Sequence, residues 1–186
     1  MFNKKIKMMA QDKRQDRRDS AEENEQLFHI QKTLCSIAKE KNFSLDLSNF
    51  YGISRGKNAL YLAQNGELYR STLRKRNKFY DSKTFDAFTE ISVKHKKINL
   101  FFFCKSTLIS GGSQDNICTE IGEFITNIKT RNNSYPDNND FYVLLLDGKY
   151  WKTFNEEDMM LPKNVISCNS ENFVEKINFF LKKLCV

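Results

Sequence analysis

Residues that bind zinc are scarce in this chain. It has two histidines, His29 and His95, and five cysteines, which are scattered without a Cys-x-x-Cys pair. Because structural zinc sites take four such ligands at characteristic spacings, the sequence excludes one. An odd number of cysteines also argues against a disulfide framework and is typical of free thiols in a reducing compartment. We therefore expect a cytoplasmic protein.

Long apolar runs are absent as well. No stretch approaches the ~20 consecutive apolar residues that cross a bilayer, so we expect no membrane partner. The first residues of the chain carry charge but lack the apolar core and the cleavage site of a signal peptide. The glycine pair within Ser110–Ser113 is not followed by Gly-Lys-Ser/Thr, which excludes a P-loop nucleotide site.

What the chain does have is adequate length and positive charge. Its 186 residues are enough for one domain with a sizeable core, but not comfortably for two. The 30 lysines and arginines against 23 acidic residues give a net charge of +7, which favours a polyanionic partner, nucleic acid before membrane. Residues 1–19 hold seven of the basic residues and three aspartates. We expect a flexible basic arm there, either a solvated tail or a segment that touches phosphates.

A hairpin and a second basic segment follow one another near the middle of the chain. Asn65-Gly66 joins two strand-like runs and predicts a hairpin with a type I′ turn. Just beyond it, basic residues mix with Phe79 and Tyr80, a combination that can follow a phosphate backbone and stack on bases. That function and a plain charged loop stay open as alternatives. The candidate DNA-binding residues of this segment are Arg74, Lys75, Arg76 and Lys78.

Hydrophobic periodicity outlines a folded domain over residues 20–186. Residues 84–93 and 98–105 are predicted to form adjacent strands joined by a polar turn. The continuous apolar run at 141–148 predicts a central strand covered on both faces. The order of elements predicts an α/β fold with a mixed central sheet flanked by helices. The other elements expected are a helix after a Ser20–Glu23 capping box, a helix from Asp115 or Asn116, a loop at 131–140, a short strand at 164–168 and a helix at 170–184.

Two charged residues stand at one end of the predicted strand pair. Asp86 opens the first strand and Lys105 closes the second, so a hairpin returns both to the same end of the sheet. An acidic side chain there can hold Mg²⁺, and a neighbouring lysine can position the attacking water and stabilise the charge that develops on a phosphate. Such hydrolysis usually needs two carboxylates, because a single one binds Mg²⁺ weakly.

The order of these segments resembles that of type II restriction endonucleases of the PD-(D/E)XK nuclease superfamily. The resemblance is carried by FDAF, INLFFFCKSTLISGGSQDN, EFI and FYVLLLDGKYW, and it covers roughly residues 80–183. It implies a restriction-endonuclease-like fold and a Mg²⁺-dependent endonuclease that cleaves double-stranded DNA. It places Asp86 on the metal-binding aspartate and Lys105 on the catalytic lysine. Such enzymes are commonly homodimers, and a DNA methyltransferase of the same system is a further expected partner.

The chain departs from the family pattern at Phe103. The family carries Glu or Asp two residues before the lysine, and a phenylalanine cannot ligate a metal. Some members take the second carboxylate from the helix that follows, where this chain has Glu120 and Glu123 on roughly one helical face. The resemblance then implies catalysis by Asp86, Lys105 and Glu120, with Glu123 as a further candidate metal ligand. The alternative is a catalytically inactive DNA-binding protein on the same fold.

Two amide side chains lie near the start of the same helix. Gln114 and Asn116 are candidates for contacts with base edges, because an amide can bind adenine through two hydrogen bonds. Both residues are equally suited to cap a helix. A third interpretation of the positive charge is an interaction protein whose basic arm meets an acidic protein partner.

Overall fold

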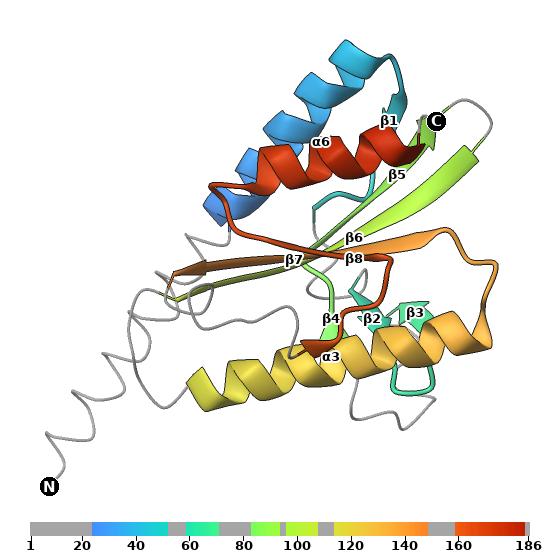
Figure 1. Cartoon of the computed structure of the whole chain (residues 1–186), viewed down its shortest axis with the longest axis vertical. Helices are drawn as coiled ribbons and strands as arrows, with labels where there is room; N and C mark the ends of the chain where they lie inside the picture. Colours follow the sequence, from blue (N-terminus) through green and yellow to red (C-terminus); the bar gives the residue numbers. More distant parts are fainter. Residues whose placement is uncertain are drawn as a thin grey trace, which may run out of the picture.

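A five-stranded mixed sheet forms the centre of the molecule (Figure 1). The structure, a computed structural model, describes residues 24–51, 59–70, 83–93, 96–107, 114–148 and 159–184. The strands of this sheet are β1 (Ser44–Asp46), β5 (Ala87–Val93), β6 (Lys96–Thr107), β7 (Asp140–Gly148) and β8 (Val165–Cys168). They lie in the order β1-β5-β6-β7-β8. β5 pairs antiparallel with β1 and β6, whereas β6, β7 and β8 run parallel.

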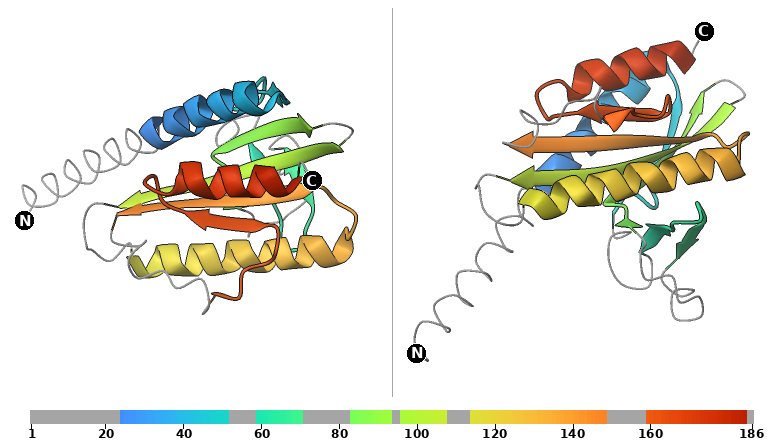
Figure 2. Two further views of the ribbon diagram at one scale, coloured as in Figure 1. Left: turned by 45° about the horizontal axis from the view of Figure 1, so that its top comes forward. Right: turned by 60° about the horizontal axis from the view of Figure 1, so that its bottom comes forward.

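Helices cover both faces of the central sheet (Figures 1 and 2). The helix at residues 24–41 and helix α6 (Phe173–Leu184) lie on one face, and helix α3 (Gln114–Ser134) lies on the other. Helix α3 connects β6 to β7, which is the crossover that two parallel strands require. The predicted α/β class with a mixed central sheet is therefore confirmed.

Strands β6 and β7 each supply two hydrophobic cores. Phe102 and Cys104 belong to the core beneath the helix at 24–41 and α6, whereas Phe101 and Phe103 belong to the core beneath α3. Because successive side chains of a strand point to opposite faces, an unbroken apolar run fills both cores at once. The same holds in β7, where residues 142–146 are fully buried. The prediction of a central strand covered on both faces is confirmed there.

A second, three-stranded sheet lies beside α3 on the same side of the central sheet (Figure 1). Its strands are β2 (Leu60–Leu62), β3 (Leu68–Arg70) and β4 (Lys83–Thr84), in the order β3-β2-β4. The predicted hairpin at Asn65-Gly66 is confirmed, but the predicted type I′ turn is wrong. That turn needs positive φ at both central residues, and only Gly66, with φ of 81°, has it. The Gly66 N–H donates to the Ala63 carbonyl at 2.9 Å, so the glycine closes a longer hairpin loop.

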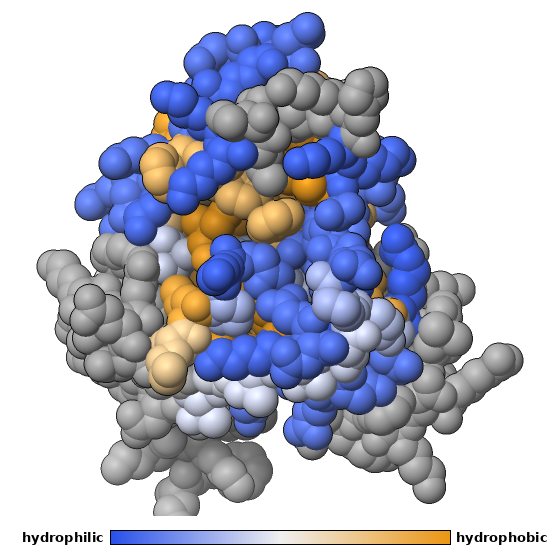
Figure 3. All heavy atoms as spheres, turned by 45° about the vertical axis from the view of Figure 1, so that its right-hand side comes forward, coloured by the Kyte–Doolittle hydropathy of each residue, from blue (hydrophilic) through white to orange (hydrophobic). Residues whose placement is uncertain are grey.

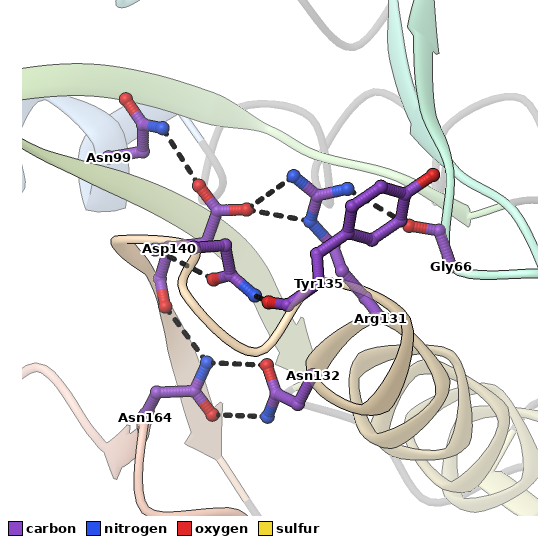
Figure 4. Close-up of polar contacts among 8 residues, drawn as sticks. Gly66, Asn99, Arg131, Asn132, Tyr135, Asp140 and Asn164 are labelled. Carbon is purple, nitrogen blue, oxygen red and sulfur yellow. Dashed lines mark hydrogen bonds and ion pairs between the residues drawn. The ribbon is translucent and has the colours of Figure 1, made fainter.

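Helix α3 begins earlier and ends later than the sequence predicted. It starts at Gln114, and it continues to Ser134 through part of the expected loop, which leaves only residues 135–139 to connect it to β7. The extension has a local cause at Arg131 (Figure 4). The Nε and Nη2 atoms of its guanidinium each lie 2.6 Å from Oδ2 of Asp140, and its Nη1 donates to the Gly66 carbonyl at 3.0 Å. These tertiary contacts stabilise a last helical turn that its asparagine-rich composition disfavours.

Asp140, at the start of β7, is the centre of this polar network (Figure 4). Its side chain is 1% exposed, and its Oδ1 accepts a hydrogen bond from Asn99 of β6 at 2.8 Å. Asn164 donates to the Asp140 carbonyl at 2.8 Å and exchanges two amide hydrogen bonds with Asn132 of α3. The network ties the end of α3 to the sheet at the amino-terminal end of β7.

One strand of the central sheet was not predicted. Strand β1 has only three residues, which is too short for an alternating pattern to stand out from its surroundings. It is recognised by its pairing, because Leu45 lies opposite Ile91 of β5 and the Thr89 hydroxyl donates to the Asp46 carbonyl at 2.6 Å. Its assignment therefore depends on a partner that is distant in sequence.

The surface carries both hydrophilic and apolar side chains. On the face shown in Figure 3, hydrophobic atoms form a central patch framed by hydrophilic ones. Large apolar side chains that are exposed include Phe28, Met160 and Phe179. Within the described ranges, no helix combines the length and the apolar character needed to cross a membrane.

Candidate active site

The carboxyl-terminal end of β6 lies at the left of Figure 1, and Asp86 contacts the strand shortly before this end. Asp86 stands immediately before β5, and its main-chain N–H donates to the Phe102 carbonyl at 2.9 Å. Its carboxylate Oδ2 accepts the main-chain N–H of Cys104 at 2.8 Å. The hairpin thus returns Asp86 to the last residues of β6, where Cys104 is followed by Lys105.

Helix α3 brings a second carboxylate to the same end of β6. The Nζ atom of Lys105 lies 3.9 Å from Oε2 of Glu120, and the two side chains are 23% and 30% exposed. An ion pair that is this long and this open to solvent contributes about 1 kcal/mol or less to stability. Its two charges are therefore within reach of a ligand, and removing either one is not expected to unfold the chain.

Phe103 occupies the position at which the resemblance expects an acid. Its side chain is 2% exposed and stacks on Phe124 of α3, with ring centroids 4.7 Å apart. The Lys105 ammonium lies 5.0 Å from the centroid of the Phe103 ring, within the range of a cation–π contact. The ring therefore supports both the helix that carries Glu120 and the lysine itself.

Two carboxylates are anchored at consecutive residues of this strand. Asp86 is held by the backbone of Cys104, and Glu120 is paired with the side chain of the next residue, Lys105. Among the residues that the structure describes, no three or more His, Cys, Asp or Glu side chains gather closely enough to hold a metal ion. Mg²⁺ is usually bound by one or two carboxylates, with waters and substrate phosphates as its other ligands. The described residues therefore do not offer a full cage of protein ligands, and the carboxylates available for an ion such as Mg²⁺ at this strand end are those of Asp86 and Glu120.

A polar cluster on the other face of the sheet supports the same strand ends. Gln26, which is 5% exposed, donates through Nε2 to Asp147 Oδ2 at 2.6 Å and to the Lys105 carbonyl at 3.5 Å. The Ser170 N–H donates to Asp147 Oδ1 at 2.8 Å, and the Ser170 hydroxyl also donates to this carboxylate. These contacts fix the backbone of Lys105. No sequence pattern pointed to Gln26, and the Asp147-Gly148 pair on its own is typical of a plain turn.

Glu123, the other carboxylate predicted in α3, lines a cleft between this helix and the β2–β3 hairpin. The cleft has a volume of about 510 Å³ and is lined by Gln64, Thr119, Gly122, Glu123, Thr126 and Asn127. Glu120 and Glu123 thus face different surroundings, although they lie one helical turn apart. The first pairs with Lys105 at the end of β6, and the second faces the hairpin cleft.

The predicted DNA-binding residues are described only in part. Gln114 and Asn116 lie in the first turn of α3, which begins where β6 ends (Figure 1). The basic residues Arg74, Lys75, Arg76 and Lys78 and the arm at residues 1–19 lie outside the described residues. Whether they contact DNA stays a prediction.

Comparisons with known proteins do not add to this picture. No family model, curated protein or solved structure matches the chain. The function is therefore inferred from the residues at the end of β6 and from the charge of the chain.

Proposed function

We propose that the chain is a Mg²⁺-dependent endonuclease that hydrolyses phosphodiester bonds of double-stranded DNA, on a restriction-endonuclease-like fold. The observation that carries the proposal is the ion pair of Lys105 and Glu120 at 3.9 Å, next to Cys104, whose main-chain N–H is bound by the Asp86 carboxylate. This is the set of groups that the resemblance requires, with the second acid supplied by the helix. The mixed sheet with helices on both faces and the net charge of +7 agree with it.

Each of the three residues has a distinct role in the proposal. Asp86 and Glu120 bind Mg²⁺, with Glu123 as the second candidate in α3. When bound, the ion polarises the phosphate and lowers the pKa of a coordinated water. The Lys105 ammonium orients the attacking water and stabilises the charge that develops on the phosphate oxygens. The water oxygen forms the new bond to phosphorus as the bond to the leaving oxygen, in line with it, breaks. The water gives up a proton to solvent, and the leaving oxygen takes up a proton to become a hydroxyl group.

Phe103 is compatible with this chemistry because Glu120 of α3 can supply the second carboxylate. The ring fills the core at a point where a carboxylate would be buried, and its face lies 5.0 Å from the Lys105 ammonium. It therefore positions the lysine, while Glu120 supplies the charge that the family takes from the strand.

Cleavage of a mixed, unmethylated phage DNA with Mg²⁺ or Mn²⁺ tests the proposal. We expect discrete fragments from the native chain, and a loss of rate of about 10²–10³-fold in Lys105→Ala and in Glu120→Ala. Lys97→Ala is a matched control, since this lysine of β6 is 73% exposed and pairs across the surface with Glu90. It should cut as the native chain does.

The cleavage assay also identifies the metal ligands. If Glu123 binds the metal, Glu123→Ala slows cleavage of every duplex, as Glu120→Ala does. A native chain that does not cut DNA with either ion, or a Lys105→Ala chain that cuts at the native rate, refutes the proposal.

Phe103 also favours one other function, a DNA-binding protein without catalytic activity on the same fold. A buried phenylalanine at the acid position is what a lost active site would contain. In that case the native chain binds duplex DNA without cutting it, and the logarithm of its affinity falls with the logarithm of salt by about 0.9 per phosphate contacted. A flat salt dependence would count against contact with phosphates.

A further inference from the structure

The cleft beside Glu123 is closed at one end by direct contact between α3 and the hairpin. The Gly66 carbonyl accepts from Arg131 at 3.0 Å, and a Cβ on Gly66 would lie 2.7 Å from the Arg131 Cα (Figure 4). One turn earlier in the helix, Asn127, which is 3% exposed, donates to the Leu62 carbonyl at 3.3 Å. The hairpin is therefore fixed against the second half of α3, and the angle between them is set by buried contacts.

The cleft extends along α3 from Asn127 back to Thr119, the residue next to Glu120. Gly122 lies in its wall, and a Cβ added to this residue would meet no atom within 4 Å. A glycine inside a helix costs about 0.5–1 kcal/mol relative to alanine, so Gly122 does not favour the helix and contributes space instead. The open part of the cleft is thus a preformed hollow beside the helical turn that carries Glu120.

The open part of the cleft carries hydrogen-bonding side chains on both walls. Glu123 and Thr119 come from the helix, and Gln64 comes from the loop of the hairpin. A carboxylate repels phosphate, but it accepts hydrogen bonds from the exocyclic amino group of a base, and glutamine pairs with adenine through its amide. The chemistry of the cleft therefore matches a base edge and disfavours the DNA backbone.

We infer that this cleft selects the base next to the cleaved phosphate, and that it accepts adenine or cytosine through the amino group. The inference rests on the proposed nuclease function, because the cleft lies beside the Lys105–Glu120 pair. Glu123 is then a specificity residue, and Glu120 is the metal ligand. Guanine in the major groove presents acceptors and thymine presents an acceptor and a methyl group, so neither matches the Glu123 carboxylate.

The test is to cleave a duplex library with one randomised segment in Mg²⁺ and to sequence the fragment ends. For the native chain we expect adenine or cytosine at one fixed distance from the cut, preferred by about 10- to 100-fold. Glu123→Ala and Gly122→Leu should lose this preference while the other positions keep theirs. Glu175→Gln, a charge change on α6 across the sheet, is the control and should keep the native profile.

Two further measurements separate selection from folding and from metal binding. Leucine is a good helix former and its Cβ has room, so the urea midpoint of Gly122→Leu should not fall below the native value. A duplex whose selected base carries hydrogen in place of the amino group should be cut slowly by the native chain. In Glu123→Ala, that duplex and the natural one should be cut at the same rate.

The outcomes distinguish this inference from the proposed function. If the native chain cuts DNA and both variants keep its base preference, the inference is overturned and the nuclease stands. The inference is also overturned if the native chain cuts DNA without any base preference. It is overturned as well if Glu123→Ala cuts every duplex more slowly and keeps the native base preference. If the native chain does not cut the library, the proposed function fails, and the inference fails with it.

Discussion

Replacing Asp140 by alanine should destabilise the protein strongly. The side chain of Asp140 is 1% exposed, and its carboxylate accepts from the Nε and Nη2 atoms of Arg131 and from Asn99 (Figure 4). The Arg131 side chain is itself only 14% exposed. In Asp140→Ala the guanidinium keeps its hydrogen bond to Gly66 but loses the carboxylate with which it forms an ion pair, and the Asn99 amide loses an acceptor.

The size of the effect follows from those contacts. Removing one partner of a buried ion pair costs about 3–5 kcal/mol, because the other charge stays buried without compensation. We therefore expect a loss of about 4 kcal/mol, a large part of the 5–15 kcal/mol that typically holds a domain together. For a chain of this length each kcal/mol lowers Tm by about 2–4 °C, which gives a decrease of roughly 8–16 °C.

Urea unfolding followed by circular dichroism measures this loss. If the substitution acts on the native state, the m value should not change. Asp137→Ala is the matched control, because this aspartate is exposed in the loop before β7 and should change stability by about 0.5 kcal/mol or less. The double variant Arg131→Met/Asp140→Leu removes both charges and should recover most of the loss. A loss below about 1 kcal/mol for Asp140→Ala would refute the reasoning. So would a double variant whose loss of stability equals the sum of the losses in the two single variants.

Four further substitutions test the fold and the site. Gly66→Ala should lower the free energy of unfolding, measured in urea, by about 2–4 kcal/mol, because φ is 81° and the new Cβ meets the Arg131 backbone. Gly122→Ala should raise it by about 0.5–1 kcal/mol, because alanine favours a helix and the new Cβ meets no atom within 4 Å. Phe103→Glu should reduce the thermal stability sharply, since a carboxylate there replaces a ring stacked on Phe124; native-like stability would contradict the packing described. Burial raises the pKa of the Tyr142 phenol, so stability measured in urea should fall as the pH rises above about 10, and it should fall less in Tyr142→Phe.

The main elements of the fold were predictable because their patterns are local. The apolar run of β7 and the stripe of α6 that includes Ile177 and Leu181 follow directly from which faces must be buried. The pairing of β5 with β6 follows from two apolar runs separated by a short polar turn. Periodicity and turn composition suffice wherever an element is long and its partner is next in sequence.

The errors occur where a distant contact overrides the local pattern. Helix α3 extends to Ser134 because Arg131 is held by Asp140 and Gly66. Strand β1 exists only through its partner β5, and the turn at Asn65-Gly66 differs from the predicted type because it packs on α3. In each case the deciding interaction joins residues that no sequence window contains together.

For the candidate site, the charged residues and the strand ends at which they stand follow from the amino-acid sequence alone. Asp86 and Lys105 belong to one sheet end because a hairpin returns to its start, and Glu120 and Glu123 belong to the helix that follows. The rotation of α3 about its axis does not follow from the sequence pattern, because it depends on the packing of residues such as Phe124 on Phe103. That rotation brings Glu120 to 3.9 Å from Lys105 and turns Glu123 toward the hairpin cleft. The physical reason is that the burial of one face of a helix fixes the direction in which each of its other side chains points.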